Sequence, residues 1–533
     1  MMYPHPHTPT APTSNNFVLE NQLSQEIPTT TVRHFLDLFD TDKMAKSKGK
    51  RKHEGSQNDV TTKRHKNTTI ITPPPEKTSS QVKDEHRTIQ AIGLHEDDLE
   101  LAIDTLHTLA GNPTVIKSKA CKDLRTAVYE FRQACTTGFN AAVDTNLTAR
   151  ISGALADGGY TEARILLAEM RIRGQTPKLG ALCRWVRDLD VVSGLAEQIG
   201  GSSKRTSREE SLLVVLDSIL RVAGPIDYTE VGTTVTGPIA PRKAWDLRNG
   251  STRQQVYANV LDGTIPALLA GNAQLQFRTI DTTPGLQRKP PNLHPAILHA
   301  SKDDAIALSS AAPKTTHHKH PVVPNLHLLK DVLAPEECTQ IIAAAEAIGF
   351  TPDAPIRGEG EESSILAHNF YWIVDTAFCT KLWQRVEPFV PEKMGSKRVR
   401  GLNRRFRVYR YVPGAEYRAH IDGAWPPSSI SPNDTYIYDD SPPNAKQSSL
   451  FTFLIYLNDE FESGETTFFL PSAREGVMNA YPVKPIQGSV AMFPHGETEG
   501  SLLHEGTGVG RGATPSAKYV IRTDVLYDVD PEQ

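Results

Sequence analysis

The C-terminal part of the chain is rich in apolar runs of strand length. Residues 405–412 are rich in β-branched and aromatic side chains and precede a turn signal, Pro413-Gly414. Residues 449–457 form a nearly continuous apolar run, which is typical of a buried strand. Similar short segments follow at residues 465–470, 488–494 and 517–527. Many short strands separated by turn residues predict an antiparallel jelly roll of two sheets, a double-stranded β-helix.

A helical spacing of apolar residues replaces the strand pattern between residues 97 and 223. Residues 124–127 are followed by Gly138, and residues 160–163 are followed by Gly174 at the same spacing. The two segments are 36 residues apart. Helix pairs at a fixed period stack on one another and bury a shared apolar face. The pattern therefore predicts an α-helical hairpin module in the N-terminal half of the chain.

Residues 163–177 resemble the second helix of a pentatricopeptide repeat, and residues 146–158 resemble its first helix. Arrays of such repeats can read single-stranded RNA one base per repeat. Two or three hairpins offer only a small footprint, so we expect the module to contact a protein partner. Contact with RNA is the alternative.

The chain of 533 residues is long enough for several domains. Its first residues are rich in Pro, Thr, Ser, His and Lys without sustained periodicity, which predicts disorder. The overall prediction is an α+β multidomain protein whose jelly roll has flanking helices. Its parts are a disordered basic tail (residues 1–88), the helical module (89–223), a subdomain or linker (224–320) and the jelly-roll domain (321–533).

Composition and charge indicate the cellular compartment. The five cysteines are scattered and odd in number, which favours a reducing environment. There is no apolar core of a signal peptide and no apolar run long enough to cross a membrane. Basic clusters at residues 46–52 and 63–66 have the spacing of a bipartite nuclear localisation signal; a solvated tail is the alternative. We expect a nuclear or nucleo-cytoplasmic protein that is not secreted and has no membrane contact.

The C-terminal strands carry a set of candidate metal ligands. His420 and Asp422 are two residues apart, so in an extended chain both face one side while Ile421 faces the other. With His504 they supply two imidazoles and one carboxylate, the facial triad of non-haem Fe(II) oxygenases. The same tripeptide pattern occurs at residues 95–97, where helix-start chemistry explains it, and we assign no metal role there.

Several ordered motifs resemble the catalytic domain of the prolyl 4-hydroxylase α-subunit, within the Fe(II)/2-oxoglutarate-dependent dioxygenases. They lie at residues 410–422, 455–468, 483–495, 504–506 and 518–519. Upstream, residues 329–350 resemble the helix that precedes the barrel in that family. Pro335 suits the first position of this helix, and Gly349 suits its end.

The resemblance implies the roles of individual residues. His420, Asp422 and His504 would be the iron ligands and the catalytic residues. Lys518 would bind the distal carboxylate of 2-oxoglutarate, because a buried carboxylate needs a cationic partner. Tyr411 would add a hydroxyl donor to the same carboxylate. The implied cofactors are Fe(II), 2-oxoglutarate, O2 and, by family resemblance, ascorbate.

Two departures from the family pattern bear on this assignment. The segment before Lys518, residues 508–515, is longer than the usual turn of that family. Arg522 lies on the same strand face as Lys518 and is the alternative anchor, although Lys518 is favoured. Ser463 replaces the first glycine of a Gly-Gly turn.

Other titratable residues near these motifs have simpler interpretations. Residues 495–497 imitate a His-x-carboxylate pair but lie in a Gly-rich polar stretch, which predicts a surface turn. Glu505 would point away from a metal bound by its neighbour. Arg407 and Arg410 are expected either at a solvated strand edge or along a substrate groove. Tyr417 is a further candidate site residue.

Residues 423–448 form a long loop directly after the candidate ligands. Loops of this length within a compact domain are commonly lids, binding loops or disordered segments. We therefore expect this loop to control access of the substrate.

Together these features predict an enzyme that hydroxylates a C–H bond, releases succinate and CO2, and acts on a protein side chain. The alternative is a nuclear scaffold that binds RNA or protein and whose oxygenase domain is not catalytic.

Overall fold

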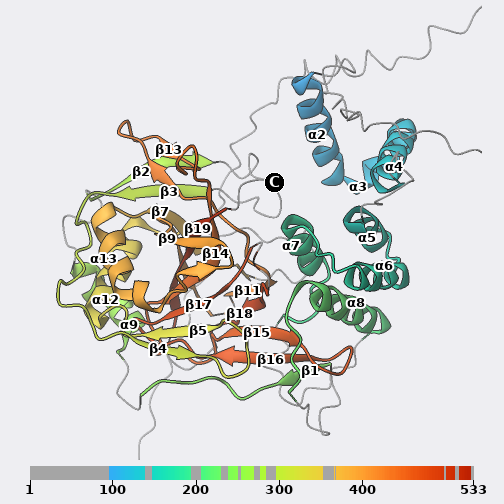
Figure 1. The fold of residues 1–533 in the computed structure, drawn as a ribbon. Coiled ribbons are helices and arrows are strands. Elements are labelled where there is room, and N and C mark those ends of the chain that lie inside the picture. Colours follow the sequence, from blue (N-terminus) through green and yellow to red (C-terminus); the bar gives the residue numbers. More distant parts are fainter. Residues whose placement is uncertain are drawn as a thin grey trace, which may run out of the picture. The chain divides into compact units, whose positions relative to one another are not determined.

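The computed structural model combines helices with two large sheets (Figure 1), which confirms the predicted mixed α+β class. The structure describes residues 95–137, 147–193, 206–229, 238–249, 254–268, 276–283, 296–351, 365–366, 368–413, 415–496, 498, 500–510 and 515–529. The predicted disordered tail and its two basic clusters lie outside these residues. Among the described helices, none is both long and apolar enough to cross a bilayer.

Helices occupy the described residues between positions 96 and 223. They are α2 (Glu96–Ala110), α3 (Pro113–Ile116), η3 (Lys119–Cys121), α4 (Lys122–Thr137), α5 (Leu147–Ala156), α6 (Tyr160–Ile172), α7 (Leu179–Asp188) and α8 (Ser207–Ala223). Helix α8 begins with a capping box in which Thr206 and Glu209 satisfy each other's backbone N–H groups. The predicted helix pair corresponds to α5 and α6, but its identity as a pentatricopeptide repeat stays a prediction.

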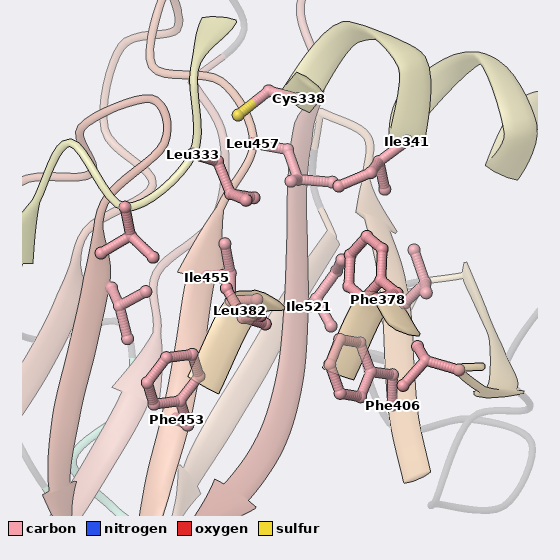
Figure 2. Close-up of a cluster of buried hydrophobic side chains, with 14 of the residues drawn as sticks. Leu333, Cys338, Ile341, Phe378, Leu382, Phe406, Phe453, Ile455, Leu457 and Ile521 are labelled. Carbon is pink, nitrogen blue, oxygen red and sulfur yellow. The ribbon is translucent and has the colours of Figure 1, made fainter. Parts of the chain in front are cut away.

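The larger sheet has the strand order β2-β3-β7-β10-β19-β14-β17-β5-β4, with β9 also pairing β19 and β8 pairing β9. Its strands are β2 (Phe277–Thr283), β3 (Ala296–Ser301), β4 (Thr316–Lys319), β5 (His327–Lys330), β7 (His368–Ile373), β8 (Lys393–Met394), β9 (Lys397–Leu402), β10 (Arg405–Tyr411), β14 (Gln447–Tyr456), β17 (Val490–Pro494) and β19 (Lys518–Asp528). Helices α12 (Pro335–Ile348) and α13 (Thr376–Val386) pack on one face of this sheet. Figure 2 shows this apolar layer, in which Phe378 of α13 lies near Phe406 of β10.

The smaller sheet has the strand order β1-β16-β15-β18-β11-β6. Its strands are β1 (Ile239–Pro241), β6 (Ile365–Leu366), β11 (Ala415–His420), β15 (Thr466–Pro471), β16 (Met478–Val483) and β18 (Leu503–Gly506). A second apolar cluster joins this sheet to the inner face of the larger one, through residues such as Phe468 and Val520. The two sheets therefore enclose a common interior. The name double-stranded β-helix stays a prediction.

A third apolar cluster covers the outer face of the smaller sheet. It joins helices α5 to α8 to Ile421, Phe469 and Leu503 among others. Ile421 therefore faces away from its neighbours His420 and Asp422, as the alternation of an extended chain predicts. Described parts of residues 224–320 add β1 to the smaller sheet and β2, β3 and β4 to the larger one. The same segment contains helices α9 (Val256–Leu261) and α10 (Thr264–Ala267).

The helix predicted within residues 329–350 is α12, and its local signals act as expected. Pro335 occupies the first turn, and Gly349 ends the helix with φ +89°. The Glu337 carboxylate accepts the Ala334 N–H at 2.8 Å and forms a buried ion pair with Arg385 at 2.7 Å. This ion pair ties α12 to α13 on the outer side of the larger sheet.

The turn before β17 requires glycine at position 488. Gly488 has φ +75°, and a β-carbon there would lie 2.1 Å from the Leu333 carbonyl oxygen. We expect Gly488→Ala to destabilise the protein by about 3 kcal/mol or more, since left-handed strain adds to a backbone clash. Gly180→Ala is the matched control, because Gly180 lies in α7 with open space around it, and about 0.5–1 kcal/mol of stabilisation is expected. The urea concentration at the midpoint of unfolding should be lower for Gly488→Ala than for Gly180→Ala. Equal midpoints would contradict the requirement for glycine at position 488.

Candidate metal centre

Two neighbouring strands of the smaller sheet bring the predicted ligands together. His420 ends β11 and lies opposite His504 of β18 in the antiparallel register, with ring centroids 4.3 Å apart. Asp422 follows β11 by two residues. The ligand atoms of the three side chains all lie within 4.8 Å of one another. Among the described residues, these three are the group of His, Cys, Asp and Glu side chains that can hold a metal ion.

Both imidazoles present their Nε2 atoms to this centre. His420 Nδ1 lies 2.7 Å from the Arg418 carbonyl oxygen, and His504 Nδ1 lies 3.1 Å from the Leu502 carbonyl oxygen. A carbonyl oxygen can only accept a hydrogen bond, so each ring must donate from a protonated Nδ1 and keeps the Nε2 lone pair for a metal. The Nε2 atoms lie 3.4 and 3.6 Å from the two Asp422 oxygens. The donor set therefore fits a divalent metal ion.

The electrostatics of the centre favour the ligating protonation states. Burial lowers the pKa of His504 to about 3, so this imidazole is neutral. Burial by itself would raise the pKa of Asp422, but Arg522 and the two imidazoles hold it well below its usual range. Arg522 Nη1 lies 2.7 Å from Asp422 Oδ1, and Thr452 Oγ1 donates to Oδ2 at 2.6 Å. The carboxylate is thus ionised and fixed in orientation.

A pocket opens at this centre between the two sheets. It is lined by Tyr409, Tyr411, Tyr417, His420, Asp422, Thr452, Leu454, Thr466, Phe493, His504, Gly506, Lys518, Val520 and Arg522. The predicted candidates Tyr411 and Tyr417 are both in this lining, and the Tyr417 ring centroid is 4.1 Å from that of His420. The predicted metal ligands and the predicted co-substrate residues therefore line one pocket: His420, Asp422, His504, Tyr411, Lys518 and Arg522.

The two cations of this pocket differ in their surroundings. Arg522 is paired with Asp422 and, at 3.2 Å, with Asp524. Lys518 is buried, and its Nζ donates to the Gly464 carbonyl at 2.7 Å; no carboxylate of the described residues lies within ion-pair distance of it. Burial lowers the pKa of Lys518 to about 8, against the opposing effect of the Glu465 carboxylate. Lys518 is thus the cation left available for an anionic ligand.

Neither a protein-family model nor a curated protein matches the sequence. Seventy-one solved chains match part of this chain, and they include the following two. One is the viral collagen prolyl hydroxylase vCPH from Paramecium Bursaria Chlorella virus-1 in its 2OG complex, at 19% identity over 38% of this chain and 97% of that chain, with a TM-score of 0.25. The other is an oxidoreductase of the 2OG-Fe(II) oxygenase family from Burkholderia pseudomallei, at 14% identity over 38% of this chain and 84% of that chain, with a TM-score of 0.24. The chemistry assigned to this pocket therefore rests on its own residues.

The prediction of a surface turn at residues 495–497 is wrong for His495. This side chain is 1% exposed, because it follows β17 directly into the protein interior. Its Nδ1 lies 2.7 Å from Thr452 Oγ1, and its Nε2 lies 2.8 Å from Ser449 Oγ. Since Thr452 donates to Asp422, its oxygen accepts the Nδ1–H of His495. His495 is thus a supporting residue two hydrogen bonds behind the metal centre.

Other predicted residues lie away from the pocket. Arg407 donates to Asn369 at 2.9 Å, and Arg410 forms an ion pair with Glu346 at 2.9 Å, so neither lines the described pocket. Glu505 is buried next to His504 but is also absent from the described lining. His95 is exposed directly before α2, as expected for a helix start.

The loop after the ligands contains a small hairpin of β12 (Ser429–Ile430) and β13 (Tyr436–Ile437). Its Trp425 stacks on Arg405, whose guanidinium carbon lies 3.9 Å from the ring centroid. No residue of this loop lines the described pocket. Control of substrate access by the loop stays a prediction.

Sequence reasoning missed the residues that support the ligands. Thr452 and Asp524 are hydrogen-bonding partners of Asp422 and Arg522, and Tyr409 and Phe493 wall the pocket. Thr452 lies in β14, whose residues from Ser449 to Phe453 are all buried. A threonine within the otherwise apolar run 450–457 is the signal that could have identified it.

Proposed function

We propose that this chain is an Fe(II)- and 2-oxoglutarate-dependent dioxygenase. The observation that carries the proposal is the convergence of His420, Asp422 and His504 in one pocket with a buried cation, Lys518, that no described carboxylate pairs. A triad of this kind leaves coordination positions open for a chelating co-substrate and O2. A non-catalytic scaffold is not favoured by any feature of the described site.

Each residue has a stated task in this proposal. Bound iron with 2-oxoglutarate and O2 supplies the oxidation of a C–H bond to an alcohol, with release of succinate and CO2. His420, Asp422 and His504 hold the metal, and Lys518 binds the distal carboxylate of the co-substrate with the Tyr411 hydroxyl beside it. The apolar walls exclude water from the pocket, which strengthens these charge interactions.

The proposal extends to the substrate class and cellular context. The motif resemblance to prolyl 4-hydroxylases supports a protein side chain as substrate, and it implies ascorbate as a reductant. The basic clusters of the tail support nuclear entry. The helical module is proposed to contact a protein partner, with RNA as the alternative.

The decisive test is formation of succinate from 2-oxoglutarate by the purified full chain. We expect turnover that depends on added Fe(II), that a chelator abolishes and that fresh Fe(II) restores. The full chain is required because helices α5 to α8 cover the sheet that carries both histidines. Folded protein that binds metal but forms no succinate with or without candidate peptides would contradict the proposal.

The co-substrate affinity is expected to fall at alkaline pH. Lys518 has a pKa lowered to about 8, and only its protonated form attracts the distal carboxylate. As pH rises through this value, the half-saturating concentration of 2-oxoglutarate should rise by about tenfold per pH unit. Lys518→Arg is the matched variant, because arginine stays charged, and its profile should stay flat to about pH 10. Equal slopes in the two proteins would contradict the assignment of the anchor.

A further inference from the structure

The turn after helix α7 contacts the strand that bears His420. The Asp190 carboxylate accepts a hydrogen bond from Arg418 Nε at 2.8 Å. Ser193 Oγ accepts the backbone N–H of Ala419 at 2.8 Å. These contacts join residues more than two hundred positions apart in the sequence, and they fall on the two residues immediately before His420.

Arg418 is held at both ends by this arrangement. Its side chain is bound by Asp190, and its backbone carbonyl accepts the Nδ1–H of His420 at 2.7 Å. That carbonyl selects the imidazole tautomer and fixes the plane of the ring. Asp190 therefore holds the residue whose backbone carbonyl orients the metal ligand His420.

Asp190 is itself rigidly placed. It is 7% exposed, and its Oδ1 accepts the backbone N–H groups of Val192 and Ser193, both at 3.1 Å. Its Oδ2 accepts the Ser193 hydroxyl at 2.6 Å in addition to Arg418. A buried carboxylate with four donors has little freedom to move. The turn thus forms a preorganised support for β11.

This support replaces a missing strand partner. On one side β11 pairs β18, but on the other side β6 pairs only Ala415 and Glu416. Beyond these residues, no strand of the described chain pairs that edge. The Ser193 hydroxyl receives the Ala419 N–H instead, and the Cys183 thiol of α7 donates to the Ile421 carbonyl at 3.4 Å. The helical segment therefore contacts the strand on both sides of His420.

We infer that Asp190 is a positioning residue for His420, and that the turn after α7 is a structural part of the metal centre. The inference rests on the proposed function and deepens it. The helical segment then contributes to metal affinity directly, in addition to any partner that it binds. Outer-shell partners of metal-bound histidines typically account for 10–100-fold of metal affinity.

Co(II) titration of the full chain tests this role, because Co(II) reports ligand geometry through its visible absorption bands. In Asp190→Asn, the amide oxygen can still accept the two backbone N–H groups. The amide nitrogen that replaces Oδ2 cannot accept the hydrogen bond from Arg418. We expect about 10-fold weaker Co(II) binding and an altered band pattern. Asp188→Asn is the matched control. Asp188 is two residues away, has a 55% exposed side chain and forms an ion pair with Arg187, so unchanged affinity is expected.

A double-mutant cycle separates positioning from general stability. If Asp190 acts through Arg418, adding Asp190→Asn to Arg418→Ala should weaken Co(II) binding by less than Asp190→Asn does alone. Thermal unfolding of each metal-free variant reports any loss of the fold. Wild-type affinity and bands in folded Asp190→Asn would overturn the inference and leave the proposed function standing. Co(II) binding no stronger in wild type than in His420→Ala would overturn both.

Discussion

Replacing His504 by alanine is expected to reduce succinate formation by more than about 100-fold at saturating 2-oxoglutarate. Loss of outer-shell partners alone costs 10–100-fold in metal affinity or activity, and a first ligand is worth more. His504 is buried, neutral and directed at Asp422 by its bond to the Leu502 carbonyl. Its removal leaves the metal with one imidazole and one carboxylate. The rate of succinate formation and the Fe(II) affinity, measured by titration, should fall together.

A matched control is available in the chain itself. His95 belongs to the second His-x-Asp tripeptide, is exposed and precedes α2, so His95→Ala should keep wild-type turnover. His504→Gln checks that the loss follows from the missing imidazole rather than from a cavity, since glutamine fills much of the same space. Turnover in His504→Ala within tenfold of wild type would remove this residue from the metal centre.

Replacing Lys518 by alanine is expected to raise the half-saturating concentration of 2-oxoglutarate by about 30-fold or more. Truncating one partner of a buried charge pair costs about 2–5 kcal/mol, and most of this appears in binding. The metal should still bind, because Lys518 contacts none of the three ligands and its Nζ donates to the Gly464 carbonyl. Succinate kinetics against 2-oxoglutarate concentration, with a parallel Co(II) titration, measure the two effects.

Arg522→Ala provides the contrast that decides between the two cations. Arg522 binds Asp422 at 2.7 Å, so its loss should weaken metal binding as well as turnover. Lys518→Ala should change the co-substrate dependence alone. A raised 2-oxoglutarate requirement confined to Arg522→Ala would reverse the assignment.

The sequence placed the candidate ligands His420 and Asp422 together because the signal that relates them is local. An extended chain places His420 and Asp422 on one face regardless of the remaining fold, and the buried runs around them specify strands. The α12 signals, Pro335 and Gly349, also act within a few residues. Patterns of this kind survive tertiary folding because they depend on backbone geometry alone.

The residues that support the ligands depend on tertiary pairing, which local patterns do not encode. Thr452 of β14 in the larger sheet reaches Asp422, which follows β11 of the smaller sheet, so this contact depends on how the two sheets face each other. His495 was taken as a surface turn because its Gly-rich neighbours are polar, yet the strand before it leads inward. The link from Asp190 to Arg418 spans 228 residues and has no signature in either segment.

The helical cover of the smaller sheet also bears on solubility. A fragment cut at the predicted domain boundary, residues 321–533, would lose α5 to α8 and expose the apolar outer face that includes Ile421, Phe469 and Leu503. It would also uncover the unpaired edge of β11, and bare strand edges pair readily with other chains. We therefore expect the helices to protect the two-sheet part of the chain from aggregation.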